Sequence, residues 1–257
     1  MNLKDVKAVV TGGASGLGEA CVRMIAGGGG RAAIFDLPMQ KDRAEKLIAE
    51  LGAGVIFCST DVTSEESVLA SVAKAVDAFR GINTAINCAG VGDPAKLLSK
   101  KGPMALSFFN RVVQINLVGT FNVIRLAVEQ MVKNEAGVDG EKGVVINTAS
   151  AAAFDGQVGQ PAYSASKAGV VGMTLPLARE CADYGVRVMT IAPGLFNTPM
   201  LAILPQAARD ALGAMVPFPR RLGEPSEFAM LCRQIIENPM LNGEVIRLDG
   251  AIRMAAK

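Results

Sequence analysis

The sequence predicts an α/β fold, a doubly wound parallel β-sheet of about seven strands with helices on both faces. Short apolar runs alternate with longer stretches of helical periodicity, as in folds that pass from strand to helix to parallel strand. Several runs are apolar throughout, which is typical of parallel strands covered on both sides. The chain shows no internal repeat, low-complexity tract or linker, so we expect residues 1–257 to form a single domain.

The expected elements follow one another in a regular order. The predicted strands are Lys7–Thr11, Arg31–Asp36, Gly54–Cys58, Thr84–Asn87, Val144–Thr148, Val186–Ile191 and Gly243–Leu248. The predicted helices lie near 16–27, 40–51, 64–79, 104–133, 162–182 and 225–237. Right-handed crossovers between the strands would place these helices on both faces of the sheet.

Two segments interrupt this order. Residues 91–103 read as a polar loop, and residues 193–224 are rich in proline, methionine and alanine. Both follow strands and therefore lie at the carboxyl edge of the sheet, where ligands bind in open parallel sheets. We expect 193–224 to form a substrate lid; an ordinary amphipathic helix packed on its own core is the alternative.

The composition restricts the chemistry. A formal charge of +2 without basic runs argues against a nucleic-acid partner. The chain has no histidine, which excludes Ser-His-Asp catalysis, Cys-His catalysis and imidazole-bound metals. Its five cysteines are scattered without CxxC spacing, which disfavours disulfides and zinc sites. We expect no metal, and proton transfer by a carboxylate, lysine, cysteine or tyrosine.

The beginning of the chain bears on its location. Residues Met1–Thr11 lead directly into the first predicted strand and do not resemble a signal peptide. No apolar stretch reads as long enough to cross a bilayer. The expected location is the cytoplasm, with no membrane partner.

A glycine-rich turn joins the first predicted strand to the first predicted helix. Its glycines let the backbone turn tightly and approach a pyrophosphate, while the helix N-terminus supplies amide donors. A tight turn without a ligand is the alternative. The predicted cofactor contacts in this turn are Gly12, Ser15, Gly16, Leu17 and Gly18.

Asp36 ends the second predicted strand, 18 residues beyond Gly18. A carboxylate there accepts both ribose hydroxyls of NAD and repels the 2′-phosphate of NADP. A strand-terminating surface aspartate is the alternative. Together, the glycine turn and Asp36 predict a single Rossmann-type domain that binds NAD.

Later strand ends supply further cofactor candidates. Asp61 and Val62 follow the third strand and would contact the adenine, although Asp61 would serve equally well to open a turn. Cys88, Ala89 and Gly90 follow the fourth strand, where small residues let the backbone pass beneath a cofactor.

One of the two tyrosines, Tyr163, has a lysine one helical turn later on the same face, Lys167. An ammonium close to a phenol favours phenolate and moves its pKa of about 10 toward neutrality. Tyr184 has no such partner and is expected to pack. Ser150 ends the fifth strand, and Asn116 lies within an apolar helix, where a buried amide needs a partner.

In this order, the TGxxxGxG, NCAG, Asn, Ser, YSASK and PG motifs make the whole chain resemble the short-chain dehydrogenase/reductase family. The resemblance implies a catalytic tetrad of Asn116, Ser150, Tyr163 and Lys167. Ser150 would orient the substrate oxygen, Tyr163 would exchange its proton, and Asn116 would anchor a relay water. Lys167 would lower the Tyr163 pKa and, like Tyr163, would contact the cofactor. The nicotinamide segment would include Pro193, Phe196 and Thr198. Cys88 departs from the commonest motif, which has asparagine there.

The resemblance is strongest to the 3-hydroxyacyl-CoA dehydrogenases of that family, through INTASAAAFDGQVGQPAYSASKAGVVGMTLPLARE, RVMTIAPGLFNTPM and NPMLNGEVIRLDGAIRM. It implies NAD, acyl-CoA substrates, a place in fatty acid metabolism and a homotetramer. Apolar residues on more than one face of 104–133 and 162–182 would provide the subunit contact. The alternatives are the same chemistry on a hydroxysteroid or polyol, and a non-catalytic NAD-binding scaffold.

Three polar residues are candidates for the substrate site beside Ser150 and Tyr163. Gln157 would hydrogen-bond a thioester carbonyl, and Lys100 and Lys101 would attract coenzyme A phosphates; solvated loop residues are the alternative for all three. The acyl chain or steroid would pack on Leu195, Phe196, Met200, Leu201, Ile203, Leu204, Met215 and Phe218.

Overall fold

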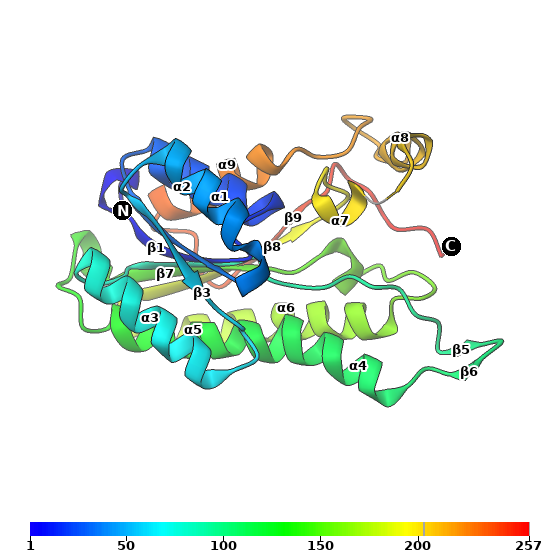
Figure 1. Cartoon of the computed structure of the whole chain (residues 1–257), viewed down its shortest axis with the longest axis horizontal. Helices are drawn as coiled ribbons and strands as arrows, with labels where there is room; N and C mark the ends of the chain where they lie inside the picture. The colour runs from blue at the N-terminus through cyan, green and yellow to red at the C-terminus, as the bar shows by residue number, and fades with distance from the viewer. Residues whose placement is uncertain (203, 257) are drawn as a thin grey trace.

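Seven parallel strands form the central sheet of the computed structural model, which describes residues 1–202 and 204–256 (Figure 1). Their order across the sheet is β3-β2-β1-β4-β7-β8-β9. The strands are β1 (Lys7–Thr11), β2 (Arg31–Asp36), β3 (Val55–Ser59), β4 (Thr84–Asn87), β7 (Gly143–Thr148), β8 (Val186–Pro193) and β9 (Val245–Leu248). The predicted fold class is confirmed, and each predicted strand lies within two residues of the observed one.

Helices cover both faces of this sheet (Figure 1). One face carries α1 (Gly16–Gly27), α2 (Lys41–Leu51) and α9 (Pro225–Glu237). The other carries α3 (Glu65–Phe79), α4 (Leu106–Val113), α5 (Gly119–Met131) and α6 (Pro161–Ala182). Single helical turns lie at Leu3–Asp5, Pro38–Gln40, Val138–Gly140 and Ala151–Ala153.

The strands are apolar at successive positions because neighbouring side chains pack into the two hydrophobic clusters on opposite faces of the sheet. On β1, Val10 packs in the cluster beneath α1 and α9, while Val9 packs in the cluster beneath α3 and α5. On β7, Ile146 and Val145 divide in the same way. Since successive side chains of a strand point to opposite faces, a sheet covered on both sides needs apolar residues at every position.

The predicted helix 104–133 differs from the observed one in its middle. Residues Gln114–Val118 form a π-turn between α4 and α5, and this irregularity centres on the buried Asn116. Residues Leu106–Met131 are together long and apolar enough to cross a membrane by length and composition, but half of the qualifying window is buried in the fold. That burial is what a helix covering a sheet requires.

The two irregular segments both stand at the carboxyl edge. The prediction of a plain loop at 91–103 is wrong, because Leu98–Ser99 (β5) and Gly102–Pro103 (β6) pair as a small antiparallel hairpin. This hairpin projects from the right-hand side of Figure 1. Residues 193–224 contain α7 (Pro199–Ala202) and α8 (Gln206–Ala214), above the same edge. Ile203, a predicted wall residue, lies outside the described residues, as does Lys257.

Candidate active site

Tyr163 and Lys167 occupy the first two turns of α6. Pro161 begins this helix, because a proline at the first position forfeits no helical hydrogen bond. The buried Lys167 Nζ donates to the Thr148 carbonyl at 2.7 Å and lies 5.9 Å from the centroid of the Tyr163 ring. The end of β7 therefore holds the ammonium beside the ring.

Burial decides the protonation of both groups. Loss of solvent raises the pKa of Tyr163, against a smaller lowering by the Ser150 hydroxyl. Burial likewise lowers the pKa of Lys167 to about 8. The Lys167 ammonium is directed to the Thr148 carbonyl, and in the chain alone burial dominates the Tyr163 pKa, so the predicted lowering by Lys167 stays a prediction for the complex with cofactor.

Ser150 lies two residues beyond the end of β7 and caps the turn Ala151–Ala153. Its Oγ accepts a hydrogen bond from the Ala152 amide at 3.1 Å. The Ser150 side chain also interacts with the Tyr163 hydroxyl and acts to lower the Tyr163 pKa. Ser150 and Tyr163 are thus brought together from the end of a strand and the start of a helix.

The Asn116 side chain joins three parts of the site. Its Oδ1 accepts from the Val91 amide at 2.8 Å, and its Nδ2 donates to the Val91 carbonyl at 2.9 Å and to Ser166 Oγ at 3.1 Å. Its own carbonyl accepts from Thr120 Oγ1 at 2.8 Å. The buried amide therefore has the partners that its burial demands, and it fixes the segment leaving β4 against α6.

The glycine-rich turn has backbone shapes and contacts that exclude side chains. Gly12 and Gly16 have φ of 63° and 56°, a region that favours glycine. A Cβ on Gly12 would lie 3.1 Å from both the Ala89 nitrogen and the Cys88 carbonyl carbon. A Cβ on Gly18 would collide with the Gly12 carbonyl. The turn is therefore packed tightly against the segment that follows β4.

Thr11 and Ser15 complete this region. Thr11 Oγ1 accepts from the amides of Cys88 and Ala89, at 3.1 Å each. Ser15 is the N-cap of α1 without a side-chain capping bond, and Leu17 lies in the first turn of α1. Thr11 belongs to the TGxxxGxG motif, but the motif does not show which amides the hydroxyl contacts, so this contact was not predicted.

Asp36 lies beside the same turn. Its Oδ2 accepts from the Ala14 amide at 3.0 Å, and its Oδ1 accepts from the Leu37 amide at 2.9 Å. Burial raises the pKa of this carboxyl, while these two amides and the charge of Arg43 act in the opposite direction. The carboxylate thus stands at the carboxyl end of β2 and is linked to the glycine-rich turn.

Asp61 has the turn role that the sequence left open. Its Oδ1 accepts from the Thr63 amide at 2.9 Å and from Thr63 Oγ1 at 2.7 Å. Val62 is buried, and its carbonyl accepts from Asn122 Nδ2 at 2.9 Å. Both residues lie at the end of β3, on the same edge as Asp36.

The lid segment contacts both halves of the site. A Cβ on Gly16 would lie 3.2 Å from Pro199 Cδ and 3.6 Å from Thr198 Cβ. A Cβ on Gly92 would lie 2.7 Å from Met200 Sδ and 3.8 Å from Tyr163 Cε2. Pro193 ends β8. The Phe196 side chain packs in the core, and the Phe196 backbone forms an isolated parallel β-bridge with Gly223.

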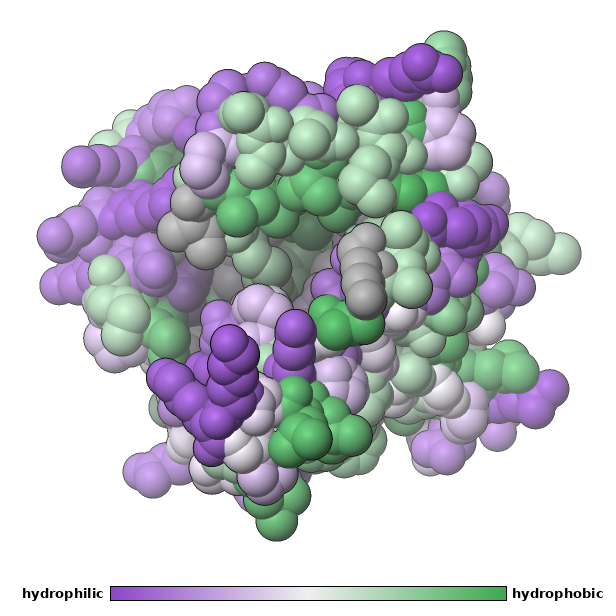
Figure 2. Space-filling model, turned by 90° about the vertical axis from the view of Figure 1, so that its right-hand side faces the viewer, coloured by the Kyte–Doolittle hydropathy of each residue, from purple (hydrophilic) through white to green (hydrophobic). Residues whose placement is uncertain are grey.

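The remaining substrate candidates lie on a neighbouring part of the carboxyl edge. Gln157 Nε2 donates to the Ala255 carbonyl at 3.0 Å, so this amide holds the C-terminal tail. Gln157 also lines a pocket of about 490 Å³ between residues 96–98 and 156–161. Lys96 lines that pocket too, whereas Lys100 and Lys101 are exposed at the β5–β6 turn. Figure 2 shows this face of the molecule, hollowed at its centre, with apolar residues along the upper rim of the hollow and many polar ones below it.

Comparison with known proteins identifies close relatives along the whole chain. The sequence model of the short chain dehydrogenase family matches residues 6–208. The chain is 53% identical to the 3-hydroxyacyl-CoA dehydrogenase type-2 of Drosophila melanogaster, covering 98% of this chain and 99% of the relative. Identity to the Homo sapiens protein of the same name is also 53%, over 98% and 97% of the two chains. The crystal structure of 3-hydroxyacyl-CoA dehydrogenase type-2 from Mycobacterium avium matches with a TM-score of 0.92 and 41% identity, covering 97% of this chain and 96% of that one.

Proposed function

The chain belongs to the short-chain dehydrogenase family, and from this premise we propose that it uses NAD to interconvert 3-hydroxyacyl-CoA and 3-ketoacyl-CoA. The observation that carries the proposal is the pairing of Ser150 with Tyr163 beside a glycine-rich turn. The similarity to two 3-hydroxyacyl-CoA dehydrogenases over nearly the full chain supports the substrate class.

The residues of the glycine-rich turn fit a dinucleotide. Glycine at positions 12 and 18 lets the turn pack closely on itself and on the segment after β4, as in the tight turns whose backbone approaches a pyrophosphate. The amides of the first turn of α1 would bind the pyrophosphate. Asp36 would accept the ribose hydroxyls and favour NAD over NADP. Asp61 and Val62 would contact the adenine, and Cys88, Ala89 and Gly90 would form the floor.

When bound, the nicotinamide exchanges a hydride with the carbon that carries the substrate oxygen. Ser150 Oγ would donate to that oxygen and orient it. The Tyr163 hydroxyl would take the proton in oxidation and return it in reduction, which is the general acid/base role. Pro193, Phe196 and Thr198 would hold the carboxamide end.

Lys167 and Asn116 would support the tyrosine. The Lys167 ammonium is the only charged group placed against the Tyr163 ring in the part of the chain that the structure describes. We propose that it favours phenolate once the cofactor ribose shares its hydrogen bonds. The Asn116 side chain is fully paired, and its backbone carbonyl accepts from Thr120 Oγ1 but has a second lone pair, with which it would hold a relay water.

The subunit contact is proposed on the outer faces of α5 and α6. Phe121 and Leu175 are both nearly half exposed there, and Val118 lies in the adjoining π-turn. Large exposed apolar side chains on adjacent helices are typical of a subunit contact. We propose a homotetramer; the cytoplasmic location and the place in fatty acid metabolism stay predictions.

A direct test is turnover of the purified chain with NAD and 3-hydroxybutyryl-CoA, followed by NADH absorbance. We expect oxidation of the acyl-CoA, with a smaller kcat/KM for a hydroxysteroid or a polyol. Turnover of the hydroxysteroid or the polyol without turnover of the acyl-CoA would identify that alcohol as the substrate class. Binding of NAD without turnover of any alcohol would support the scaffold alternative.

A further inference from the structure

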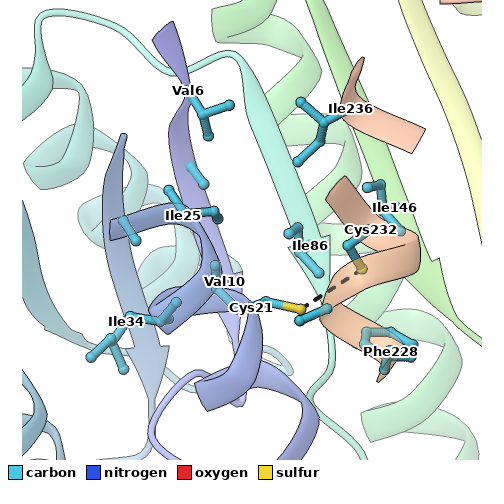
Figure 3. Close-up of a cluster of buried hydrophobic side chains, with 14 of the residues drawn as sticks. Val6, Val10, Cys21, Ile25, Ile34, Ile86, Ile146, Phe228, Cys232 and Ile236 are labelled. Atoms are coloured by element: carbon cyan, nitrogen blue, oxygen red, sulfur yellow. Dashed lines mark hydrogen bonds between the residues drawn. The ribbon is translucent and has the colours of Figure 1, made fainter. Parts of the chain in front are cut away.

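Three cysteines from distant parts of the sequence meet beneath the cofactor turn. Cys21 lies on α1, Cys232 on α9, and Cys88 on the segment after β4. The Cys21 thiol donates to Cys232 Sγ at 3.7 Å, as Figure 3 shows. Cys88 packs against the same core cluster, interaction with the Cys21 thiol raises its pKa, and Thr148 Oγ1 donates to Cys88 Sγ at 3.5 Å. Cys21 therefore interacts with both of the other thiols, and we refer to the order Cys88, Cys21, Cys232 as the line.

The line has one accessible end. Cys21 and Cys232 are fully buried in the core beneath α1 and α9, whereas Cys88 is partly exposed. The carbonyl carbon of Cys88 is one of the atoms that a Cβ on Gly12 would meet. A reagent from solvent therefore reaches the line at Cys88, from the side where the cofactor is proposed to bind.

The resting state of the line is three protonated thiols. Burial raises the pKa of Cys21 and of Cys232, and the hydrogen bond to Cys21, followed by burial, raises that of Cys88. The charge of Lys167 acts in the opposite direction at Cys88. Since thiolates are the reactive form, Cys88 combines the best access of the three cysteines with a cation, Lys167, that favours its thiolate.

We propose that Cys88 is an oxidation site from which a disulfide is passed inward to Cys21 and Cys232. A hydroperoxide oxidises the Cys88 thiol to a sulfenic acid and is itself reduced to water or an alcohol. The Cys21 thiol attacks that sulfur, water leaves, and a Cys21–Cys88 disulfide forms. The Cys232 thiol then attacks Cys21 Sγ, and Cys88 leaves as a thiol. The net change is loss of two protons and two electrons from the core pair.

The arrangement suits each step. Disulfide exchange proceeds by attack of a thiol on one sulfur of the bridge, and Cys21 is the thiol that interacts with both of the others. The final bridge joins α1 to α9, which pack directly on each other. A bound cofactor would cover Cys88 and prevent the first step; this protection alone rests on the proposed function.

Peptide mapping can follow all three thiols separately. Trypsin places them in residues 8–23, 81–96 and 222–233, each with one cysteine. Cofactor-free protein would be treated with hydrogen peroxide, alkylated and digested. We expect a cross-linked pair of 8–23 with 222–233, two hydrogens lighter than the sum of the reduced peptides, and alkylated 81–96. Cys58 and Cys181, which lie elsewhere, serve as internal controls. Absence of this cross-link, or equal oxidation of Cys58 and Cys181, would overturn the proposal.

Variants separate the steps. With Cys88→Ser, the core pair should stay reduced under the same treatment; formation of the Cys21–Cys232 bridge at the wild-type rate would remove Cys88 from the route. With Cys232→Ala, the bridge should stop at Cys21–Cys88. Circular dichroism would confirm that each variant is folded. If a variant does not fold, the peptide map of the wild-type protein tests the proposal by itself.

Protection by NAD is measured in parallel with NAD binding. At about 100 times Kd, roughly 1% of the molecules are without ligand, so oxidation should slow about 100-fold. Binding without protection would contradict the placing of Cys88 beneath the cofactor. Failure of NAD to bind would contradict the proposed function and leave the result of the cofactor-free peptide map intact.

Discussion

At the scale of single residues, the site depends on polar groups whose partners are backbone atoms. Lys167 bonds to the Thr148 carbonyl, Asn116 to Val91 and Asp36 to the Ala14 amide. The sequence predicts such side chains because their types are rare in apolar surroundings. It does not reveal the backbone partners, since every residue offers the same amide and carbonyl. The rise in the Tyr163 pKa was missed for a related reason: burial follows from packing around the residue.

Tyr163→Phe should abolish most turnover while leaving the fold and NADH binding intact. The substitution removes only the ionisable hydroxyl, and loss of general acid/base catalysis costs about 10²–10⁴-fold in rate. Steady-state kcat with an acyl-CoA substrate is the measurement. Tyr184→Phe, at the exposed second tyrosine, is the matched control and should behave as wild type. More than half of wild-type turnover in the folded Tyr163→Phe variant would rule out the assigned role.

The buried Lys167 should make stability rise with pH. Its pKa falls from 10.5 to about 8 on folding, so between these values the unfolded chain binds more protons than the folded one. The free energy of unfolding should therefore increase from pH 8 to about 10.5, by up to about 3 kcal/mol for this group.

Urea unfolding of wild type and Lys167→Met across that range would isolate the contribution of Lys167. The difference between the two free energies should change in favour of wild type as pH rises. A difference that is constant with pH would show that the lysine titrates at its ordinary value.

Asp36 should determine the choice of cofactor. Asp36→Ala should weaken NAD binding by roughly 1–3 kcal/mol, as for loss of a hydrogen bond to a charged group, and should narrow the preference over NADP. Asp36→Asn keeps an acceptor for the Ala14 amide but removes the charge. It therefore distinguishes repulsion of the NADP 2′-phosphate by the carboxylate from the hydrogen bond that holds the glycine-rich turn. Equal kcat/KM for NAD and NADP in the wild type would contradict the assignment.

At the scale of elements, strands were predicted better than the connections at the carboxyl edge. A strand buried on both faces needs an unbroken apolar run, and β1, β2 and β4 have their predicted bounds. The π-turn at Gln114–Val118 leaves the apolar pattern of its helix almost unchanged, so periodicity cannot show it. The hairpin at residues 98–103 has two-residue strands, too short to produce an alternating pattern.

The β5–β6 hairpin provides a test of acyl-CoA binding. If Lys100 and Lys101 attract the coenzyme A phosphates, replacing both with alanine should raise KM for acetoacetyl-CoA and leave KM for an uncharged ketone unchanged. Added salt should reduce the difference, because exposed charges are screened beyond about 10 Å at 0.1 M.

Lys96→Ala is the informative comparison, since Lys96 lines the pocket beside Gln157 whereas Lys100 and Lys101 lie at the turn. If Lys96→Ala raises KM for acetoacetyl-CoA more than the double variant does, the coenzyme A phosphates bind at the pocket and not at the turn. Equal effects of the double variant on charged and uncharged substrates would exclude the two turn lysines from substrate binding.

At the scale of the whole molecule, the apolar outer surface of α5 and α6 should determine assembly. Light scattering of the wild type should give a tetramer at micromolar concentration. Phe121→Arg combined with Leu175→Arg should dissociate it, because charges are costly inside an apolar contact. Leu69→Arg, at a half-exposed leucine on α3, is the control and should leave the assembly unchanged. A monomeric wild type would contradict the proposed subunit contact.

The contact of the lid with the glycine-rich turn has a kinetic consequence. Pro199 and Thr198 lie beside Gly16, while Met200 of the same segment lies, like Tyr163, beside Gly92. One short segment therefore borders both the proposed dinucleotide site and the proposed substrate site. A substitution that displaces this segment should consequently raise KM for both ligands, and not for one of them alone.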